Sequence, residues 1–456
     1  MSEYIVFIAI IVPGLLYALR GSSYLVDYTI LVFVFNREIR RVVDYLNHQF
    51  NPFSLISLTP LAMLGLLFLG FLWNLKALHP LAKKIFYFFI AAIGYGVAVG
   101  FLRNGVATFY QGAEYLSAVG MLGYVAVNPA DDKTADRWLR TAGWAGVIAA
   151  LYGWYQYMTI PAWDAFWVEQ VGFVGYLGRL VPMEMTVFST FPERGNCASY
   201  MALVMIPMLV SKRWRPLLGW PEALLLLSCI FLTLSRGGII MATICVILFP
   251  LVNKGKASGR IVLMTVVLLT CALAGLSSLP GADRLTNRFQ SLGHMQDDGS
   301  FKTRLNIAAG GWSSVLENPF GYGIGSSGLA GRINSGNQFE NNSIVTDNGW
   351  LTLMTSLGLP GFALFMAAIA MLWHYFSVLS RFGVRDDYLG LARAYLIATL
   401  IFMWSGNYFS ELSVMWIAMG RALSPLLLYK LRSGFPESAP AAAPVPAWAS
   451  ITRGSR

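Results

Sequence analysis

The stretch Thr346-Asp-Asn-Gly-Trp-Leu-Thr-Leu-Met-Thr-Ser-Leu-Gly-Leu-Pro-Gly361 places an acid–amide pair, Asp347-Asn348, at the mouth of an apolar segment that runs to residue 374. A long loop rich in Gly, Asn and Arg precedes the pair. A carboxylate where such a loop re-enters a membrane is costly unless it has a use. Asp347 is therefore a candidate general base toward a hydroxyl. An Asp or Asn here also suits the N-cap of the following helix.

Composition indicates an all-α polytopic membrane protein. The 456 residues are 56% hydrophobic and 12% charged, with a mean hydropathy of +0.57, whereas soluble chains are about a quarter charged. The net charge of +10 fits Lys and Arg in cytoplasmic loops and does not require nucleic acid as a partner.

The apolar segments predict about 12–13 transmembrane helices, because a span needs about 20 residues. Residues 1–433 form the membrane domain, and the Ala/Pro-rich residues 434–456 form a disordered cytoplasmic tail. Alternation of basic loops places loops 159–195 and 281–348 outside, with a short helix expected over 300–316. The apolar segments lie at 4–19, 23–36, 54–75, 84–101, 105–128, 138–158, 196–211, 217–234, 237–252, 260–280, 349–374, 387–405 and 410–430.

Residues 37–52 break this orientation pattern. Arg37, Arg40 and Arg41 count as external, although basic residues favour the cytoplasmic side. Apolar residues at helical spacing predict an interfacial helix here. The alternative is that the first two spans are drawn wrongly.

Two arginines are candidates for binding a phosphate or diphosphate, because guanidinium offers a planar fork of donors. Arg236 lies in Thr233-Leu-Ser-Arg-Gly-Gly238 between two apolar segments, and Arg304 lies in the first turn of the helix expected in loop 281–348. The alternatives are a snorkelling Arg236 at the interface and an Arg304 paired with loop carboxylates.

Further polar residues are candidates for substrate binding: Asn348, Arg288, Arg194, Arg179 and Glu411. Glu411 alternatively opens the last helix as an interfacial carboxylate. The Gly-rich residues 318–328 fit a flexible loop that could gate a cavity. His and Cys lack ligand spacing, so the sequence predicts no metal and no cofactor.

Four pieces of the chain, in order, resemble motifs of the O-antigen polymerase and O-antigen ligase superfamily of bacterial membrane glycosyltransferases. The resemblance covers roughly residues 186–375. The pieces are Ser189-Thr-Phe191 continuing to Asn196, Ala198 and Tyr200; Thr233-Leu-Ser-Arg-Gly-Gly238; Ser300 through Arg304 and Trp312 to Asn318-Pro-Phe-Gly-Tyr-Gly-Ile-Gly325; and Asp347-Asn348 with Leu351 and Gly358-Leu-Pro-Gly361.

The resemblance implies metal-independent, inverting transfer at the periplasmic face of the bacterial inner membrane, from a glycan on a polyprenyl diphosphate. Arg236 and Arg304 would neutralise the diphosphate leaving group, and Asp347 would deprotonate the acceptor hydroxyl. Membrane lipid, a chain-length regulator and a flippase are candidate partners.

The Asp347-Asn348 pair favours one branch of this superfamily. The ligase branch usually has His-Asn at this place, whereas Asp-Asn looks more like the polymerase branch. We therefore expect polymerisation of lipid-linked repeats into an O-antigen or exopolysaccharide. The alternatives are a ligase that moves a finished glycan to lipid or protein and, in another class, a small-anion transporter, which would place charges near the membrane midplane.

Overall fold

The computed structural model describes residues 3–52, 54–128, 131–172, 177–253, 299–327, 348–381, 386–404 and 414–424, together with residues 267, 270 and 406. Within these ranges the regular elements are all helical, as predicted. The α-helices are α1 Glu3–Leu19, α2 Tyr24–Leu46, α3 Thr59–Trp73, α4 Pro80–Asn104, α5 Ala107–Val127, α6 Asp132–Thr159, α7 Ala162–Val171, α9 Arg194–Val210, α10 Trp220–Leu232, α11 Arg236–Asn253, α14 Gly299–Glu317, α16 Gly349–Arg381, α17 Asp387–Phe402 and α18 Val414–Leu423.

Three stretches of the described chain are long and apolar enough to cross a membrane: Leu55–Trp73, Pro80–Asn104 and Gly349–Arg381. Four shorter apolar helices accompany them. These helices agree with a membrane protein. The full set of 12–13 spans and the sidedness of the loops stay predictions, and the expected segment 260–280 lies largely outside the described residues.

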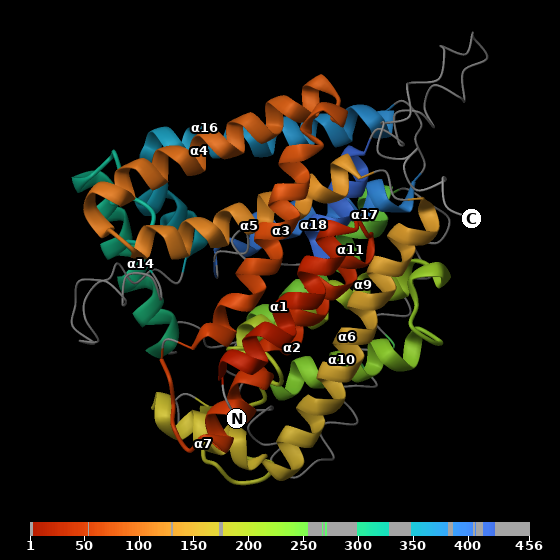
Figure 1. Ribbon diagram of the computed structural model, residues 1–456, viewed down its shortest axis with the longest axis vertical. Coiled ribbons are helices and arrows are strands. Elements are labelled where there is room, and N and C mark those ends of the chain that lie inside the picture. The colour runs from red at the N-terminus through yellow and green to blue at the C-terminus, as the bar shows by residue number, and fades with distance from the viewer. Residues whose placement is uncertain are drawn as a thin grey trace.

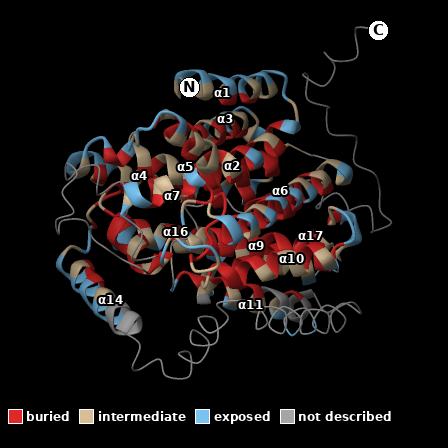
Figure 2. Ribbon diagram, turned by 90° about the horizontal axis from the view of Figure 1, so that it is seen from below, coloured by how far each residue is buried: buried red, intermediate tan, exposed pale blue. Residues whose placement is uncertain are grey.

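The core forms where helices rich in small residues approach one another closely. On α5, a side chain at Gly123 would lie 2.5 Å from the ring of Phe71 on α3, so glycine permits this contact. The long helices α4 and α16 lie side by side (Figure 1). Most residues of α5 and α9 are buried, whereas α1 and α14 lie at the periphery (Figure 2). The helix expected over 300–316 is confirmed as α14.

No separate interfacial helix begins at residue 37, and the alternative that the second apolar segment was drawn wrongly is confirmed. The α2 helix runs unbroken from Tyr24 to Leu46, because apolar residues such as Val43 continue the buried face past residue 36. The arginines there are held by protein partners, since Arg40 and Arg41 are both buried. Arg40 donates to the Asn51 carbonyl at 2.6 Å and pairs with Asp44 at 3.4 Å.

Candidate functional site

Of the eight predicted site residues, three lie outside the described part of the chain, two are located by their backbone, and three are described with their side chains. Asp347, Arg288 and Glu411 lie outside the described residues. The backbone of Arg236 lies in the first turn of α11, and the backbone of Arg304 lies in the second turn of α14.

The remaining three predicted residues are described in full. Arg179 is exposed in the segment between α7 and α9, and Arg194 opens α9 as a half-buried residue. Asn348 immediately precedes α16 and is buried.

Asn348 caps the helix that follows the acid–amide pair, which confirms the capping alternative for this residue. Its Oδ1 accepts from the backbone N–H of Trp350 at 2.9 Å and of Leu351 at 3.4 Å. These bonds satisfy two of the amides that a helix start leaves unpaired. The cap at Asn348 fixes the start of α16 at Gly349, two residues after position 347.

Two of the four motif pieces meet where α9 packs on α11. A side chain at Gly238 would lie 2.3 Å from the Ala198 methyl group, so only glycine lets the two helices approach this closely. Just before α9, the Val187 amide donates to the Leu232 carbonyl at 3.1 Å. The Ser189–Tyr200 motif and the Thr233–Gly238 motif therefore form one junction.

The other two pieces meet between α4 and α16. The Tyr322 amide donates to the Thr355 carbonyl, and the Leu359 amide to the Pro319 carbonyl, both at 2.8 Å. A side chain at Gly323 would lie 2.3 Å from the Gly100 backbone on α4, and one at Gly358 equally close to the Phe320 carbonyl oxygen. The glycines permit close packing.

Residues 321–327 are thus packed between α4 and α16, and the flexible gating loop predicted from their glycines is wrong for this part. Ile324 is fully buried. The Asn104 side chain donates to the Ile324 carbonyl at 3.1 Å, and the Gln111 side chain accepts from the Gly325 amide at 2.5 Å.

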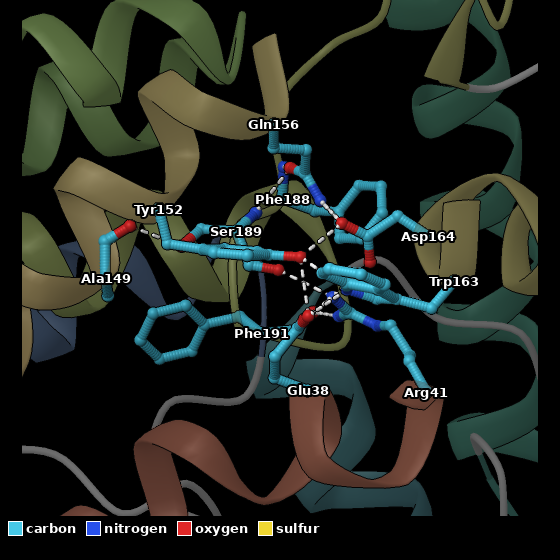
Figure 3. Close-up of polar contacts among 10 residues, drawn as sticks. All are labelled: Glu38, Arg41, Ala149, Tyr152, Gln156, Trp163, Asp164, Phe188, Ser189 and Phe191. Carbon is cyan, nitrogen blue, oxygen red and sulfur yellow. Dashed lines mark hydrogen bonds and ion pairs between the residues drawn. The ribbon is translucent and has the colours of Figure 1, made fainter. Parts of the chain in front are cut away.

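A buried ionic network ties α2 to the segment before α9 (Figure 3). Arg41 is 1% exposed and contacts Glu38 Oε2 at 2.8 Å and Asp164 Oδ1 at 3.0 Å. It also donates to the Ser189 carbonyl at 2.7 Å and to the Phe191 carbonyl. One guanidinium therefore joins α2, α7 and the first motif piece.

The network holds Ser189 in an unusual backbone conformation. Ser189 has φ of +52°, which is uncommon for a residue with a side chain and persists only where its surroundings enforce it. Its amide donates to Gln156 Oε1 at 2.9 Å, and its hydroxyl donates to the Ala149 carbonyl at 2.6 Å. Together with Arg41, these partners fix the turn that leads into α9.

Two carboxylates of the network share a single hydroxyl. Tyr152 Oη lies 2.5 Å from Glu38 Oε1 and 2.7 Å from Asp164 Oδ2, yet a phenol has one proton to donate. Burial raises the pKa of Glu38, which lies on α2 and outside the three stretches long and apolar enough to cross a membrane, and the nearby Arg41 opposes this shift.

A cavity of about 390 Å³ opens beside this network, bounded by α2, α3, α5, α9, α11 and α18. The volume lies in the range of small-molecule sites. Phe191 and the first turns of α9 form one wall. Its polar lining includes Asn36, Arg37, Tyr110, Glu114, Glu193 and Asn196.

Most residues of this site could not be recognised from the sequence. Asn36, Arg37, Glu114 and Arg41 match no known motif, so the sequence did not identify them as functional. One signal was present: the basic cluster at 37–41 on the side where basic residues are disfavoured. The buried partners of Arg40 and Arg41 explain why this cluster is tolerated, and no pattern along the chain identifies those partners.

Comparison with known proteins supports the resemblance. Residues 221–366 match the family model of the O-antigen ligase. The chain matches no curated protein and no solved structure. The matched segment contains three of the four motif pieces and lacks the first one at 189–200. Through residues 221–366, about a third of its length, this chain is therefore similar to the O-antigen ligase family, which supports the resemblance to the superfamily of O-antigen polymerases and ligases.

Proposed function

We propose that this protein is a glycosyltransferase that polymerises polyprenyl-diphosphate-linked oligosaccharide repeats into an O-antigen or exopolysaccharide. The family assignment supports glycan transfer of this general type, and the long apolar helices agree with a membrane enzyme. The observation that carries the proposal is the α9–α11 junction. It joins two motif pieces, and both helices contribute residues to the polar cavity.

The transfer step follows from the predicted residues. The acceptor hydroxyl attacks the anomeric carbon of the donor sugar, Asp347 takes the hydroxyl proton, and the bond to the diphosphate breaks with inversion. The diphosphate leaves with the bonding electron pair, and Arg236 and Arg304 stabilise its charge. No metal or cofactor takes part in this scheme.

The start of α11 supports the role of Arg236. The Ser-Arg-Gly turn lies at a helix N-terminus, where the partial positive charge of the helix favours an anion. Met241, five residues later, lines the cavity, and five residues correspond to about 7.5 Å along the helix axis. A diphosphate at this turn would keep its sugar within reach of the cavity.

The other predicted residues take supporting parts. Arg179, Arg194, Arg288 and Glu411 are proposed to contact the glycan or its carrier, with the reaction at the periplasmic face of the inner membrane. Asn348, through its cap of α16, would fix the backbone beside Asp347. Membrane lipid, a chain-length regulator and a flippase are the proposed partners.

Transfer of a finished glycan to lipid or protein is the second candidate, because the matched family is that of the ligase. The Asp347-Asn348 pair favours polymerisation. The discriminating experiment supplies purified protein in detergent with one native lipid-linked repeat and no other acceptor. A product ladder spaced by the repeat is the expected result. A single unchanged species, with transfer restored only by a different acceptor, would reject the polymerase.

A further inference from the structure

The cavity is built mainly by the part of the chain that precedes the matched family segment. Of the described residues that line it, only Met241 lies within residues 221–366. The polar groups come from α2, α5 and the start of α9. Its ligand chemistry must therefore be inferred from these residues themselves.

One wall of the cavity presents hydrogen-bond donors from α2. Asn36 is fully buried, and its Oδ1 accepts from the Thr59 hydroxyl at 2.8 Å. Its Nδ2 has no hydrogen-bond partner among the described residues. Arg37 follows it in sequence and makes a long contact of 3.4 Å with the Ser57 hydroxyl. A buried amide without a partner is costly, so a ligand oxygen in the cavity would satisfy it.

The cavity lining on α5 supplies the acceptor. Glu114 lines the cavity together with Tyr110, one helical turn earlier. The Tyr110 side chain lies close enough to both Arg37 and Glu114 to interact with their charges. Donors from α2 and a carboxylate from α5 are therefore linked across one space.

The charges identify the class of ligand. Among the described lining residues, one arginine, Arg37, stands with two carboxylates, Glu114 and Glu193. This balance gives no excess positive charge for a diphosphate. Sugar hydroxyls both donate and accept, which fits a set with both donors and acceptors. The aromatic residues Tyr110, Phe191 and Tyr200 add apolar surface for the faces of a sugar ring.

We propose that this cavity is a binding subsite for an uncharged sugar unit of the glycan, held by Asn36, Arg37 and Glu114. The diphosphate stays outside it, at the first turn of α11. The assignment rests on the proposed function for the identity of the glycan. This subsite would place sugar recognition in the N-terminal half of the chain, whereas the proposed catalytic residues lie within residues 221–366.

The test measures binding separately from transfer. The first probe is the repeat oligosaccharide of the producing strain, released from its carrier lipid by mild acid, and the second is inorganic pyrophosphate. Both are titrated against purified protein in detergent by calorimetry. Glu114→Gln removes the charge and keeps the shape, and Arg37→Lys tests the same site from another helix. Asp387→Asn, in an exposed ion pair at 3.4 Å from Arg213, is the matched control.

We expect Glu114→Gln and Arg37→Lys each to weaken oligosaccharide binding by about tenfold or more, because Glu114→Gln removes the charge from the acceptor and Arg37→Lys removes the planar fork of donors. Pyrophosphate binding should stay within twofold of wild type, and the control should change neither. Measurement of both variants keeps the test decisive if one of them fails to fold.

The outcomes separate this proposal from the function. A wild-type protein that makes the ladder but does not bind the oligosaccharide would overturn the subsite alone. Oligosaccharide binding that Glu114→Gln weakens, in a protein that makes no ladder, would support the subsite and reject polymerisation. Pyrophosphate that displaces the oligosaccharide and loses affinity in Arg37→Lys would show that the cavity is the phosphate site, which also overturns the proposal.

Discussion

Replacement of Arg41 by alanine should be among the most destabilising single changes in this protein. Arg41 is 1% exposed and its partner Asp164 is 0% exposed, so the substitution leaves a buried carboxylate without its cation. It also removes the donor to the carbonyls of Ser189 and Phe191. Breaking one partner of a buried ion pair costs about 3–5 kcal/mol. Because two carbonyls lose a donor as well, we expect the upper part of that range.

The assay compares the free energy of unfolding of detergent-purified variants, followed by tryptophan fluorescence. Arg41→Lys keeps the charge but lacks the fork that reaches four acceptors, so it should lie between wild type and Arg41→Ala. The double variant Arg41→Ala/Asp164→Asn should lose less than the sum of the two single variants, because no unpaired charge remains at Asp164.

The exposed pair Arg213–Asp387 supplies the control for this series. Its side chains are 38% and 48% exposed, and surface pairs contribute about 0–1 kcal/mol. An Arg41→Ala variant as stable as Asp387→Asn would refute the reasoning that the buried network holds α2 to the segment before α9.

Three further predictions follow from the packing, the cap and the buried carboxylate. Gly323→Ala should destabilise the protein by about 2 kcal/mol or more, because the new methyl group would lie 2.3 Å from the Gly100 backbone. Thermal unfolding of the purified variant measures this loss. Gly65→Ala is the control and should be neutral, because the space around Gly65 is open. Asn348→Ala should lower the free energy of unfolding by about 1 kcal/mol, because the helix cap is lost. Asn348→Asp keeps a capping oxygen and should restore most of this stability. Equal stability of the wild type and both variants would contradict the cap. The pKa of Glu38 is raised in the folded state, so the folded protein binds a proton at Glu38 more tightly than the unfolded chain does. The stabilisation from this proton is full below the ordinary carboxyl range and is lost as the pH rises toward neutrality. Glu38→Gln should flatten the dependence of the free energy of unfolding on pH, and an unchanged dependence would exclude Glu38 as its source.

The helical fold could be predicted from apolar periodicity with good boundaries where each segment stands alone. The segment expected at 84–101 is α4, Pro80–Asn104, and that at 349–374 is α16, Gly349–Arg381. Prediction failed at α2, because its charged residues 37–44 read as an interruption. Their partners, such as Asp164, lie more than a hundred residues away, and no local pattern contains that information.

The motifs identified four segments as candidates for a functional role, but they did not predict which segments contact one another. The Gly-rich piece at 318–328 was interpreted as mobile because glycine permits both turns and close packing. Only the neighbouring backbones of Gly100 and Gly358 show that packing is the reason. The residues that line the cavity could not be predicted, since they come from separate helices whose contact is visible only in the folded structure.

The most direct test of the central claim is the initial rate of ladder formation by the Asp347→Asn variant from one lipid-linked repeat, compared with wild type and Asp387→Asn. If Asp347 takes the proton of the acceptor hydroxyl, the rate should fall by about a hundredfold or more, with normal protein yield and unchanged product spacing in the control. A rate for Asp347→Asn within twofold of wild type would contradict the account, because the acid–amide pair would then have no part in the transfer.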